Sequence, residues 1–269
     1  MRCKSILMSL ALVLMFSGGA WAESIVIKGS TTVLPIMQKM VEEFMKKNPE
    51  YRVSLSGGGS SFGITAMLDR TCDIAMASRL VSPSEERKAQ EKGMYLVKHE
   101  IALDAVIPVV HPNNPVDNLS VDQLRAIYMG KIQNWSMLGG KDKRIAVISR
   151  DSSSGTYETW EEYVLAGNRV YRGALLQASN GAIVQTVNKS ENAIGYIGIG
   201  YIDKSIKTLS VNGVEPTREN ARDWVFPVVR TLQVYTNGAP QDGTAKMVEF
   251  IKSPEGQEIV EEVGFIGIY

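Results

Sequence analysis

Three short segments of the chain combine glycine with serine and threonine, residue types that can surround a small anion with neutral hydrogen-bond donors. They are residues 29–32 (GSTT), 57–61 (GGGSS) and 151–156 (DSSSGT). Each follows a strand-like pattern and precedes a helix-like pattern, so each marks a predicted helix N-terminus. The first N–H groups of a helix have no intrahelical partner and carry a partial positive charge. One such segment caps its helix, whereas three that converge can replace the water around a tetrahedral oxyanion.

A multiply charged oxyanion leaves water at low cost only when hydrogen bonds replace its hydration. The candidate hydroxyl donors in these segments are those of Ser30, Thr31, Ser60, Ser61, Ser154 and Thr156. The candidate backbone N–H donors are those of Thr31, Thr32, Ser61, Gly155 and Thr156. Because glycine lets the backbone approach a ligand closely, the pattern predicts a local anion site.

Two arginines are candidates for the positive charge of this site. Arg150 lies four residues before Ser154, and its guanidinium can make a bidentate contact with an oxyanion. Arg79 follows a β-like run and fits either an anion contact or a surface ion pair. Asp151 fits equally a helix cap and an orienting partner of Arg150.

Other chemistries have weaker support in the sequence. Residues 59–63 (GSSFG) match the Gly-x-Ser-x-Gly motif of serine hydrolases, in which the catalytic histidine comes last in the chain. The histidines, His99 and His111, are far from the C-terminus, so a hydrolase is a remote alternative. No Gly-Lys-Ser/Thr follows the glycine-rich turn, and the His and Cys residues have no recognisable metal-ligand spacing. We therefore expect no catalytic residue, metal or cofactor.

The bulk composition limits the classes of partner. The 269 residues, 44% of them hydrophobic, can bury a sizeable core in one large or two smaller domains. The formal net charge is zero, and no basic stripe with interleaved aromatic residues is present. Nucleic acid is therefore not an expected partner, and any bound anion must be held locally.

The first 22 residues have the three parts of a secretory signal peptide. Arg2 and Lys4 form a basic start, residues 6–16 are apolar but short for a membrane span, and residues 20–22 (AWA) fit a cleavage site. We expect this segment to be cleaved and the protein to be soluble in the periplasm. A retained N-terminal anchor is the alternative.

The cysteines support the same interpretation. Cys3 precedes the apolar run, whereas the cysteine of a lipoprotein signal would follow it, so we do not expect a lipoprotein. The mature chain would keep only Cys72 and so could form no internal disulfide. Without Arg2 and Lys4 it would carry 27 basic and 29 acidic residues, a net charge of −2.

Strand-like and helix-like patterns alternate along the chain, which favours a largely parallel sheet covered by helices. The first part predicts strands at 24–28, 51–56 and 73–77 and helices at 33–44 and 62–70. Later parts predict a helix at 121–128, a strand at 144–149, a helix at 157–165, a β-like run at 192–202 and helices at 245–251 and 254–263. Two long β-like runs, 101–110 and 224–235, are candidate crossovers between two lobes. Simple connectivity within one domain is the alternative.

Five motifs occur in an order that resembles a known family. They are residues 29–33 (GSTTV), 57–61 (GGGSS), 73–79 (DIAMASR), 150–156 (RDSSSGT) and 193–197 (AIGYI). Together they resemble the periplasmic phosphate-binding proteins of phosphate-specific ABC transporters, over essentially the whole mature chain. The Arg-x-x-x-Ser-Gly-Thr motif is the most specific of them.

This resemblance implies an α/β protein with the two-lobed architecture of type II periplasmic binding proteins. Each lobe would be a mostly parallel sheet flanked by helices, with two crossover strands as a hinge. Lobe 1 would comprise residues 23–102 and 226–269, and lobe 2 residues 103–225. The protein would be a non-enzymatic monomer that closes on inorganic phosphate and delivers it to the membrane permease of an ABC importer.

The resemblance also assigns ligand contacts to particular positions. These are Ser30, Thr31, Ser60, Ser61 and Ser78 in lobe 1 and Arg150, Ser154, Gly155 and Thr156 in lobe 2, with Thr32 and Arg79 as further candidates.

One departure from the family pattern bears on specificity. Many members have an aspartate where this chain has Arg79, and that carboxylate accepts the proton of phosphate and rejects sulfate. A second acidic position of the family is Ser152 here. Asp104 and Asp151 are the remaining candidate proton acceptors. Sulfate, molybdate or arsenate is therefore an alternative ligand, and an anion sensor is an alternative role.

Overall fold

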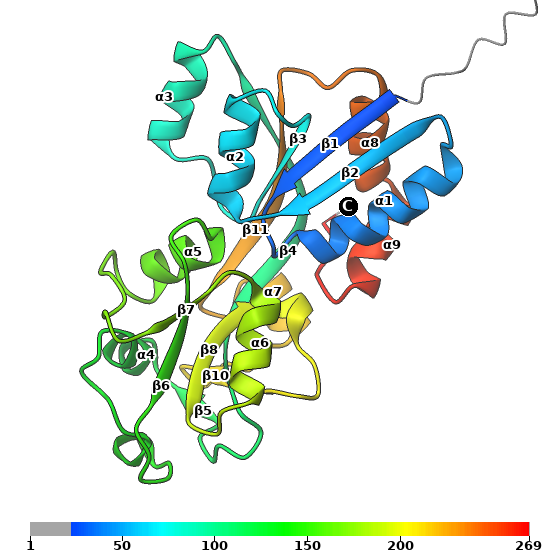
Figure 1. Ribbon diagram of the computed structural model, residues 1–269. Helices are drawn as coiled ribbons and strands as arrows, with labels where there is room; N and C mark the ends of the chain where they lie inside the picture. Colours follow the sequence, from blue (N-terminus) through cyan, green and yellow to red (C-terminus); the bar gives the residue numbers. More distant parts are fainter. Residues whose placement is uncertain (1–22, 269) are drawn as a thin grey trace, which may run out of the picture.

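The computed structural model describes residues 23–268, which form two α/β lobes (Figure 1). The predicted signal peptide, residues 1–22, and Cys3 within it lie outside the described residues. In the described part of the chain, no helix is both long and apolar enough to cross a membrane.

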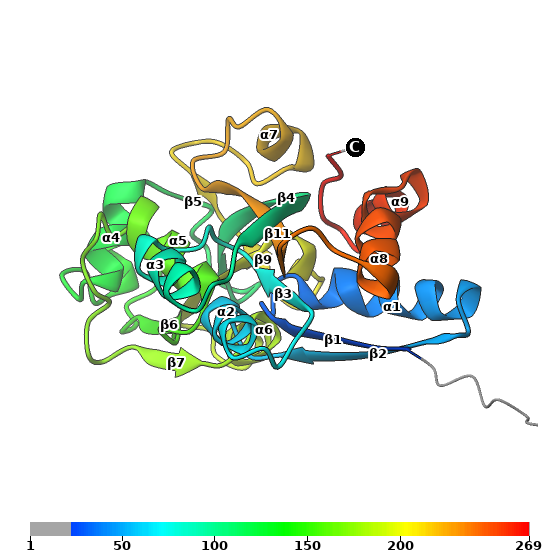
Figure 2. The same cartoon turned by 90° about the horizontal axis from the view of Figure 1, so that it is seen from above.

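Lobe 1, the upper lobe in Figure 1, combines elements from both ends of the described chain. Its strands are β1 (Glu23–Gly29), β2 (Tyr51–Gly57) and β3 (Ile74–Ala77), and β1 pairs in parallel with both others. Its helices are α1 (Leu34–Lys47), α2 (Ser60–Leu68), α3 (Pro83–Glu91), α8 (Asp242–Lys252) and α9 (Pro254–Glu262). Helices α1, α8 and α9 lie together on one side of β1 and β2 (Figure 2).

Lobe 2 is formed by the middle of the chain. Its strands are β6 (Ala146–Arg150), β7 (Leu175–Gln177), β8 (Ala193–Gly198), β9 (Lys207–Thr208) and a separate parallel pair, β5 (Asn118–Leu119) and β10 (Ser210–Val211). Its helices are α4 (Val121–Tyr128), α5 (Gly155–Tyr163), α6 (Asn180–Asn188), α7 (Arg218–Arg222) and the short 3₁₀ turns η1 (Trp135–Leu138) and η2 (Ile199–Tyr201).

Two long strands, β4 (Leu96–Val110) and β11 (Val229–Asn237), connect the lobes. They pair with each other in antiparallel orientation, and residues 106–110 of β4 continue into lobe 2, where they pair with β8. One sheet therefore runs through the molecule in the order β2-β1-β3-β11-β4-β8-β6-β7, with β9 beside β4. Of the two expected lobe boundaries, the one after residue 102 falls inside β4 and the one after 225 falls just before β11.

The sheet is less parallel than its alternating sequence pattern predicts. Strand β11 is antiparallel to both β3 and β4, and β4 is antiparallel to β8 and β9. Parallel pairs remain within each lobe, at β1 with β2 and β3 and at β6 with β7 and β8. The antiparallel pairs arise because the two connecting strands run in opposite directions between the lobes.

The predicted strand 224–235 is wrong at its start. The N–H groups of Val225 and Phe226 donate to the carbonyl of Asn220, so they close the end of α7 and cannot join a strand. Trp224 has a positive φ of 56°, which also interrupts extended backbone. The predicted run 192–202 likewise ends early, because β8 stops at Gly198 and η2 follows.

Helices α3 and α6 form in segments where the sequence patterns predict neither a helix nor a strand. Both begin at a serine cap. Ser82 accepts from the N–H of Glu85 while the Glu85 carboxylate accepts from the N–H of Ser82, which completes a capping box. Ser179 accepts from the N–H of Ala182 at the start of α6. The Ser-x-x-Glu spacing at 82–85 is typical of a capping box and so indicates the start of α3.

Candidate functional site

The three glycine and serine segments meet where the two lobes touch. The N–H of Ser61 in lobe 1 donates to the carbonyl of Ser153 in lobe 2 at 3.1 Å. The hydroxyls of Thr32 and Thr156 are hydrogen-bonded at 2.8 Å. A Cβ added to Gly155 would lie 2.4 Å from Oγ of Ser60, so the lobes are packed closely here. The predicted convergence of the segments is therefore present in the structure.

Two of the predicted hydroxyl donors accept backbone N–H groups through their oxygen atoms, Ser30 in the turn before α1 and Ser154 as the N-cap of α5. Oγ of Ser30 accepts from the N–H groups of Thr32 and Val33. The N–H of Thr32, which the sequence predicts as an anion donor, therefore already has a protein partner. Oγ of Ser154 accepts from the N–H of Tyr157 at the start of α5. Because a hydroxyl has one proton and two lone pairs, a capping serine can still donate its proton elsewhere. These backbone contacts and anion binding are therefore compatible in both residues.

Arg150 presents a buried donor without a partner. Its side chain is 1% exposed at the end of β6. Nε donates to the carbonyl of Gln177 at 2.9 Å and Nη2 to that of Ala178 at 3.0 Å. Nη1 has no hydrogen-bond partner among residues 23–268. Burial lowers the pKa of Arg150 from its ordinary value, and Asp151, 3.9 Å away, opposes that shift.

Thr31 presents a second buried group without a partner. Its Oγ1 makes no hydrogen bond within the described part of the chain. Its carbonyl accepts from the hydroxyl of Tyr201 in η2 of lobe 2. Burial raises the pKa of Tyr201, and the positive charge of Arg150 opposes this shift. Buried polar atoms of a folded protein are normally paired, so Oγ1 of Thr31 and Nη1 of Arg150 are candidate contacts for a bound anion.

The hydroxyls of Thr32 and Thr156 leave one more donor. Thr32 Oγ1 accepts from Nδ2 of Asn180 at 3.0 Å, and Thr156 Oγ1 accepts from Nη2 of Arg230 at 3.0 Å. Only one of the two threonine protons is needed for the bond between them, so the other is available. The same reasoning applies to Ser60 and Ser78, whose hydroxyls are 3.3 Å apart while Ser60 Oγ also accepts from the N–H of Ser78.

Helix α5 supplies backbone donors. Gly155 and Thr156 are its first two residues, and N–H groups at this position have no intrahelical partner. Their position beside Ser60 and Ser78 places a helix N-terminus at the lobe interface, as the sequence predicts.

Two other predicted donors have protein partners instead. Ser61 donates its N–H to Ser153 and its hydroxyl to Oε1 of Glu158, at 3.2 Å. Arg79 donates from Nη1 and Nη2 to Glu85, and its Nε forms an ion pair with Glu158 although that N–H makes no hydrogen bond within the described chain. The sequence could not indicate these contacts, because Glu158 approaches from the opposite lobe.

The candidate proton acceptors are also engaged. Asp104 is fully buried and accepts from Nε and Nη2 of Arg230, at 2.9 and 2.7 Å, and from the N–H of Ile199, at 2.9 Å. Burial raises the pKa of Asp104, and the guanidinium of Arg230 opposes this shift. Asp151 accepts from both the N–H and the hydroxyl of Ser153.

The residues that sequence reasoning missed are Arg230, Asn180, Tyr201 and Glu158. Each contacts one of the three segments from an element distant in sequence. Glu158 and Tyr201 lie shortly after the motifs at 150–156 and 193–197, but none of the four belongs to a motif, so no signal in the chain itself identified them.

The arrangement does not suit the hydrolase alternative. The serine of the Gly-x-Ser-x-Gly match is Ser61, and its hydroxyl donates to Oε1 of Glu158 at 3.2 Å, whereas the imidazole of His99 bonds to the hydroxyl of Thr236 at 2.9 Å. Nδ1 of His111 accepts from the N–H of Asn113, so neither histidine of the described chain is hydrogen-bonded to Ser61. Within residues 23–268, no group of His, Cys, Asp and Glu side chains is arranged to hold a metal ion.

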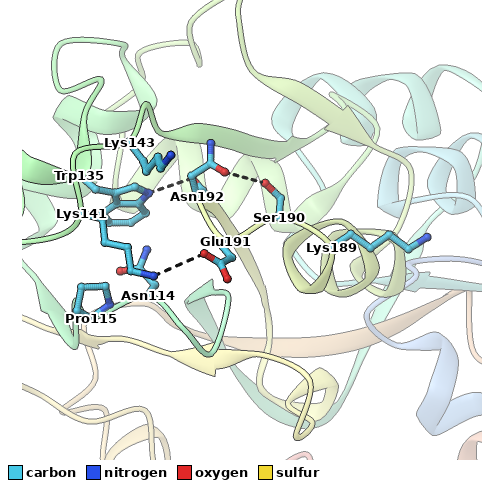
Figure 3. A pocket seen from close by; sticks show the side chains of 9 residues that line it. All are labelled: Asn114, Pro115, Trp135, Lys141, Lys143, Lys189, Ser190, Glu191 and Asn192. Atoms are coloured by element: carbon cyan, nitrogen blue, oxygen red, sulfur yellow. Dashed lines mark hydrogen bonds and ion pairs between the residues drawn. The ribbon is translucent and has the colours of Figure 1, made fainter.

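A separate cavity of about 460 Å³ lies in lobe 2 (Figure 3). Its lining includes Trp135, Lys141 and Glu191. Lys141 and Glu191 form an ion pair of 3.5 Å, and the Trp135 indole donates to the carbonyl of Asn192. None of the three anion-type segments contributes to this lining, so we do not identify it with the candidate site.

Comparison with known proteins places the chain in a family. Residues 17–255 match the PBP superfamily domain. The phosphate-binding protein PstS of Borreliella burgdorferi is 34% identical over 256 residues, covering 90% of this chain and 89% of that protein. PstS of Bacillus subtilis is 30% identical, covering 91% and 81%.

Solved structures agree with these sequence matches. A Clostridium perfringens protein assigned as a phosphate ABC transporter substrate-binding protein, solved with bound phosphate, superposes with a TM-score of 0.86 at 35% identity, covering 92% of this chain and all of that one. An ABC-type phosphate transport receptor from Vibrio cholerae gives 0.75 at 33% identity, covering 91% and 100%. The fold is the two-lobed α/β architecture of type II periplasmic binding proteins, as the sequence predicts. The chain therefore belongs to the PBP superfamily and, within it, to the family of the PstS phosphate-binding proteins.

Proposed function

We propose that this protein captures inorganic phosphate between its two lobes and delivers it to the membrane permease of an ABC importer. The relatives named PstS and the phosphate-bound structure from C. perfringens support the ligand and the transport role. The protein binds its ligand and releases it without chemical change.

The observation that carries this proposal is the buried Nη1 of Arg150, which has no partner in the described chain. Two backbone carbonyls hold the guanidinium in place, but they are neutral, and Asp151 is 3.9 Å from it. An unpaired cation in this environment is costly, and an oxyanion would both pair it and neutralise its charge.

The proposed ligand groups come from both lobes. They are Ser30, Thr31 and the Ser60–Ser78 hydroxyl pair of lobe 1, Arg150, Ser154 and the N–H groups of Gly155 and Thr156 of lobe 2, and the remaining proton of the Thr32–Thr156 pair. Ser61 and Arg79 are not among them, because the Ser61 hydroxyl donates to Glu158 and the charge of Arg79 is paired with Glu85 and Glu158. With donors on both sides, the anion favours lobe closure around the hinge strands β4 and β11.

The test is isothermal titration of the purified, phosphate-free protein with inorganic phosphate and with sulfate. We expect micromolar or tighter binding of phosphate and far weaker binding of sulfate. Equal affinity for both would contradict the assignment of phosphate.

A second ligand class is kept for one specific reason. Asp104 and Asp151 have protein partners, so neither is a free acceptor for a ligand proton. This favours an unprotonated dianion, so sulfate and molybdate belong in the same titration, together with arsenate, which is protonated much as phosphate is. A phosphomonoester turnover assay in parallel tests the hydrolase, for which we expect no product.

The cellular setting is part of the proposal. We propose that residues 1–22 are removed during export and that the mature protein is a periplasmic monomer without a lipid anchor, with lobe boundaries near residues 102 and 225. Intact-mass analysis should give a chain that begins at Glu23. A mass that includes residues 1–22 would indicate a retained anchor.

A further inference from the structure

We propose that Arg79 is a positioning residue that holds lobe 2 against lobe 1 in the closed state by pairing with Glu158. The inference rests on the proposed function, because it concerns closure of that same site. It gives Arg79 a role in ligand affinity without contact between Arg79 and the ligand.

The first half of the arrangement lies within lobe 1. Arg79 follows β3, and its Nη1 and Nη2 donate to the two carboxylate oxygens of Glu85, each at 2.8 Å. Glu85 also accepts from the N–H of Ser82 and so belongs to the capping box of α3. A planar guanidinium held by a bidentate pair has a fixed direction. Contacts within lobe 1 therefore fix the direction in which Nε of Arg79 points.

The second half crosses the interface. Nε of Arg79 lies 2.6 Å from Oε2 of Glu158 in α5, and Oε1 of Glu158 accepts from the hydroxyl of Ser61 at 3.2 Å. Nη2 of Arg79 donates to the same Ser61 oxygen at 2.9 Å. Both carboxylate oxygens of a lobe 2 residue are thus bound by lobe 1.

Glu158 connects this contact to the anion site. It lies in the first turn of α5, directly after the N–H donors of Gly155 and Thr156. A Cβ on Gly155 would lie 3.0 Å from Cγ of Arg79, so Arg79 packs against the start of the helix. Pulling Glu158 toward Arg79 therefore presses the donor end of α5 against Ser60 and Ser78.

The two halves differ in which state of the protein they stabilise. The Arg79–Glu85 pair is internal to lobe 1 and persists when the lobes separate, whereas the Arg79–Glu158 pair exists only on closure. A contact present only in the closed state raises the apparent ligand affinity by increasing the closed fraction. The side chains of Arg79 and Glu158 are 10% and 33% exposed, so solvent screens the pair only in part.

The experiment compares Glu158→Gln with wild type. Glutamine keeps the shape and the acceptor for Ser61 but removes the charge that pairs with Arg79. We expect phosphate to bind about 10-fold more weakly, mostly through faster dissociation, while the urea midpoint of the ligand-free protein stays unchanged. The matched control is Glu162→Gln, one turn further along α5, which removes the same charge and should bind phosphate like wild type.

A double-mutant cycle separates positioning from a purely structural role. Arg79→Gln and Glu158→Gln should be coupled in phosphate affinity but not in the urea midpoint of the ligand-free protein. Glu85→Gln should lower that midpoint, because its pair is internal to lobe 1. Coupling of equal size in both measurements, or wild-type affinity of Glu158→Gln, would overturn the proposal.

A measurement on the ligand-free protein tests the role of Arg79 separately from phosphate binding. Spin labels at Lys88 in lobe 1 and Lys189 in lobe 2 report the closed fraction of the ligand-free protein by pulsed EPR. Glu158→Gln should lower that fraction and Glu162→Gln should not. If wild type does not bind phosphate, the proposed function is wrong, and the distance distributions alone decide whether Arg79 holds the lobes together. Identical distributions in wild type and Glu158→Gln would then overturn the inference.

Discussion

Asp104 and Arg230 form a buried ion pair across the two strands that connect the lobes, with Nη2 of Arg230 2.7 Å from Oδ2 of Asp104. Arg230 also donates to the carbonyl of Gly155 and the hydroxyl of Thr156, at the start of α5. The hinge strands are thus bonded directly to the loop that supplies the anion donors. Asp104, which the sequence analysis names as a candidate proton acceptor for the ligand, instead pairs with Arg230.

Removal of Asp104 should destabilise the protein strongly. Asp104→Ala leaves the fully buried guanidinium of Arg230 without its counter-charge, so we expect unfolding to become easier by about 3–5 kcal/mol. Urea denaturation of the ligand-free protein measures this loss. The control is Asp117→Ala, whose exposed pair with Lys207 should cost less than about 1 kcal/mol. An equal loss of unfolding free energy in both variants would show that the buried Asp104–Arg230 pair stabilises the protein no more than an exposed pair does.

Replacement of Arg150 should affect binding. Because its free Nη1 is proposed to pair with the anion, Arg150→Ala should weaken phosphate binding by about 2–5 kcal/mol in titration calorimetry. Arg144→Ala, at an exposed position just before β6, provides the control and should leave affinity unchanged. An Arg150 variant with wild-type affinity would remove this residue from the site.

A methyl group at Gly155 should hinder lobe closure. The added Cβ would lie 2.4 Å from Oγ of Ser60 and 2.8 Å from Oγ of Ser78, both of which belong to the opposite lobe. We expect Gly155→Ala to weaken phosphate binding by about 1–3 kcal/mol, the usual cost of overpacking. Gly181→Ala in α6 meets only one atom, at 3.9 Å, and should bind phosphate normally. Normal binding by Gly155→Ala would mean that closure does not require this contact.

The affinity for phosphate should rise with pH. Guanidinium and backbone N–H groups can only donate, and the carboxylates of Asp104, Asp151 and Glu158 already have protein partners. Only the Ser and Thr hydroxyls can then accept a ligand proton, and each proton also removes a lone pair from the oxygens to which the site donates. Titration across the second ionisation of phosphate should show tighter binding of the dianion, while sulfate affinity stays constant. Tighter phosphate binding at lower pH would point to an unrecognised proton acceptor.

Cys72 should be unreactive in the folded protein. Burial raises the pKa of its thiol to about 12, so the nucleophilic thiolate is scarce at mildly alkaline pH. Iodoacetamide should modify the mature protein slowly when it is native and rapidly in urea. Fast modification of native protein would show that this part of lobe 1 opens readily.

The local order of elements was largely readable from the sequence. The helix at Val121–Tyr128 agrees with its prediction in both bounds, because Ser120 caps it and its apolar spacing is regular. The three serine and glycine segments and Arg150 were also recognisable, since capping, strand and motif signals all depend on neighbouring residues. The start of β11 was not, because Val225 and Phe226 complete α7 through Asn220.

Contacts between distant segments were decided only by the tertiary structure. Sequence alone determined that hydroxyl, N–H and guanidinium donors exist at helix starts. It could not determine that Arg79 would turn to Glu158, that Asp104 would be occupied by Arg230, or that Thr31 and Arg150 would keep free donors. Arg79 and Glu158 are 79 positions apart and Asp104 and Arg230 are 126 positions apart, and their contacts depend on how β4 and β11 set one lobe against the other. Local residue patterns indicate whether a segment forms a helix, a strand or a turn. Which side chains then pair with one another depends on how the two lobes pack across their interface.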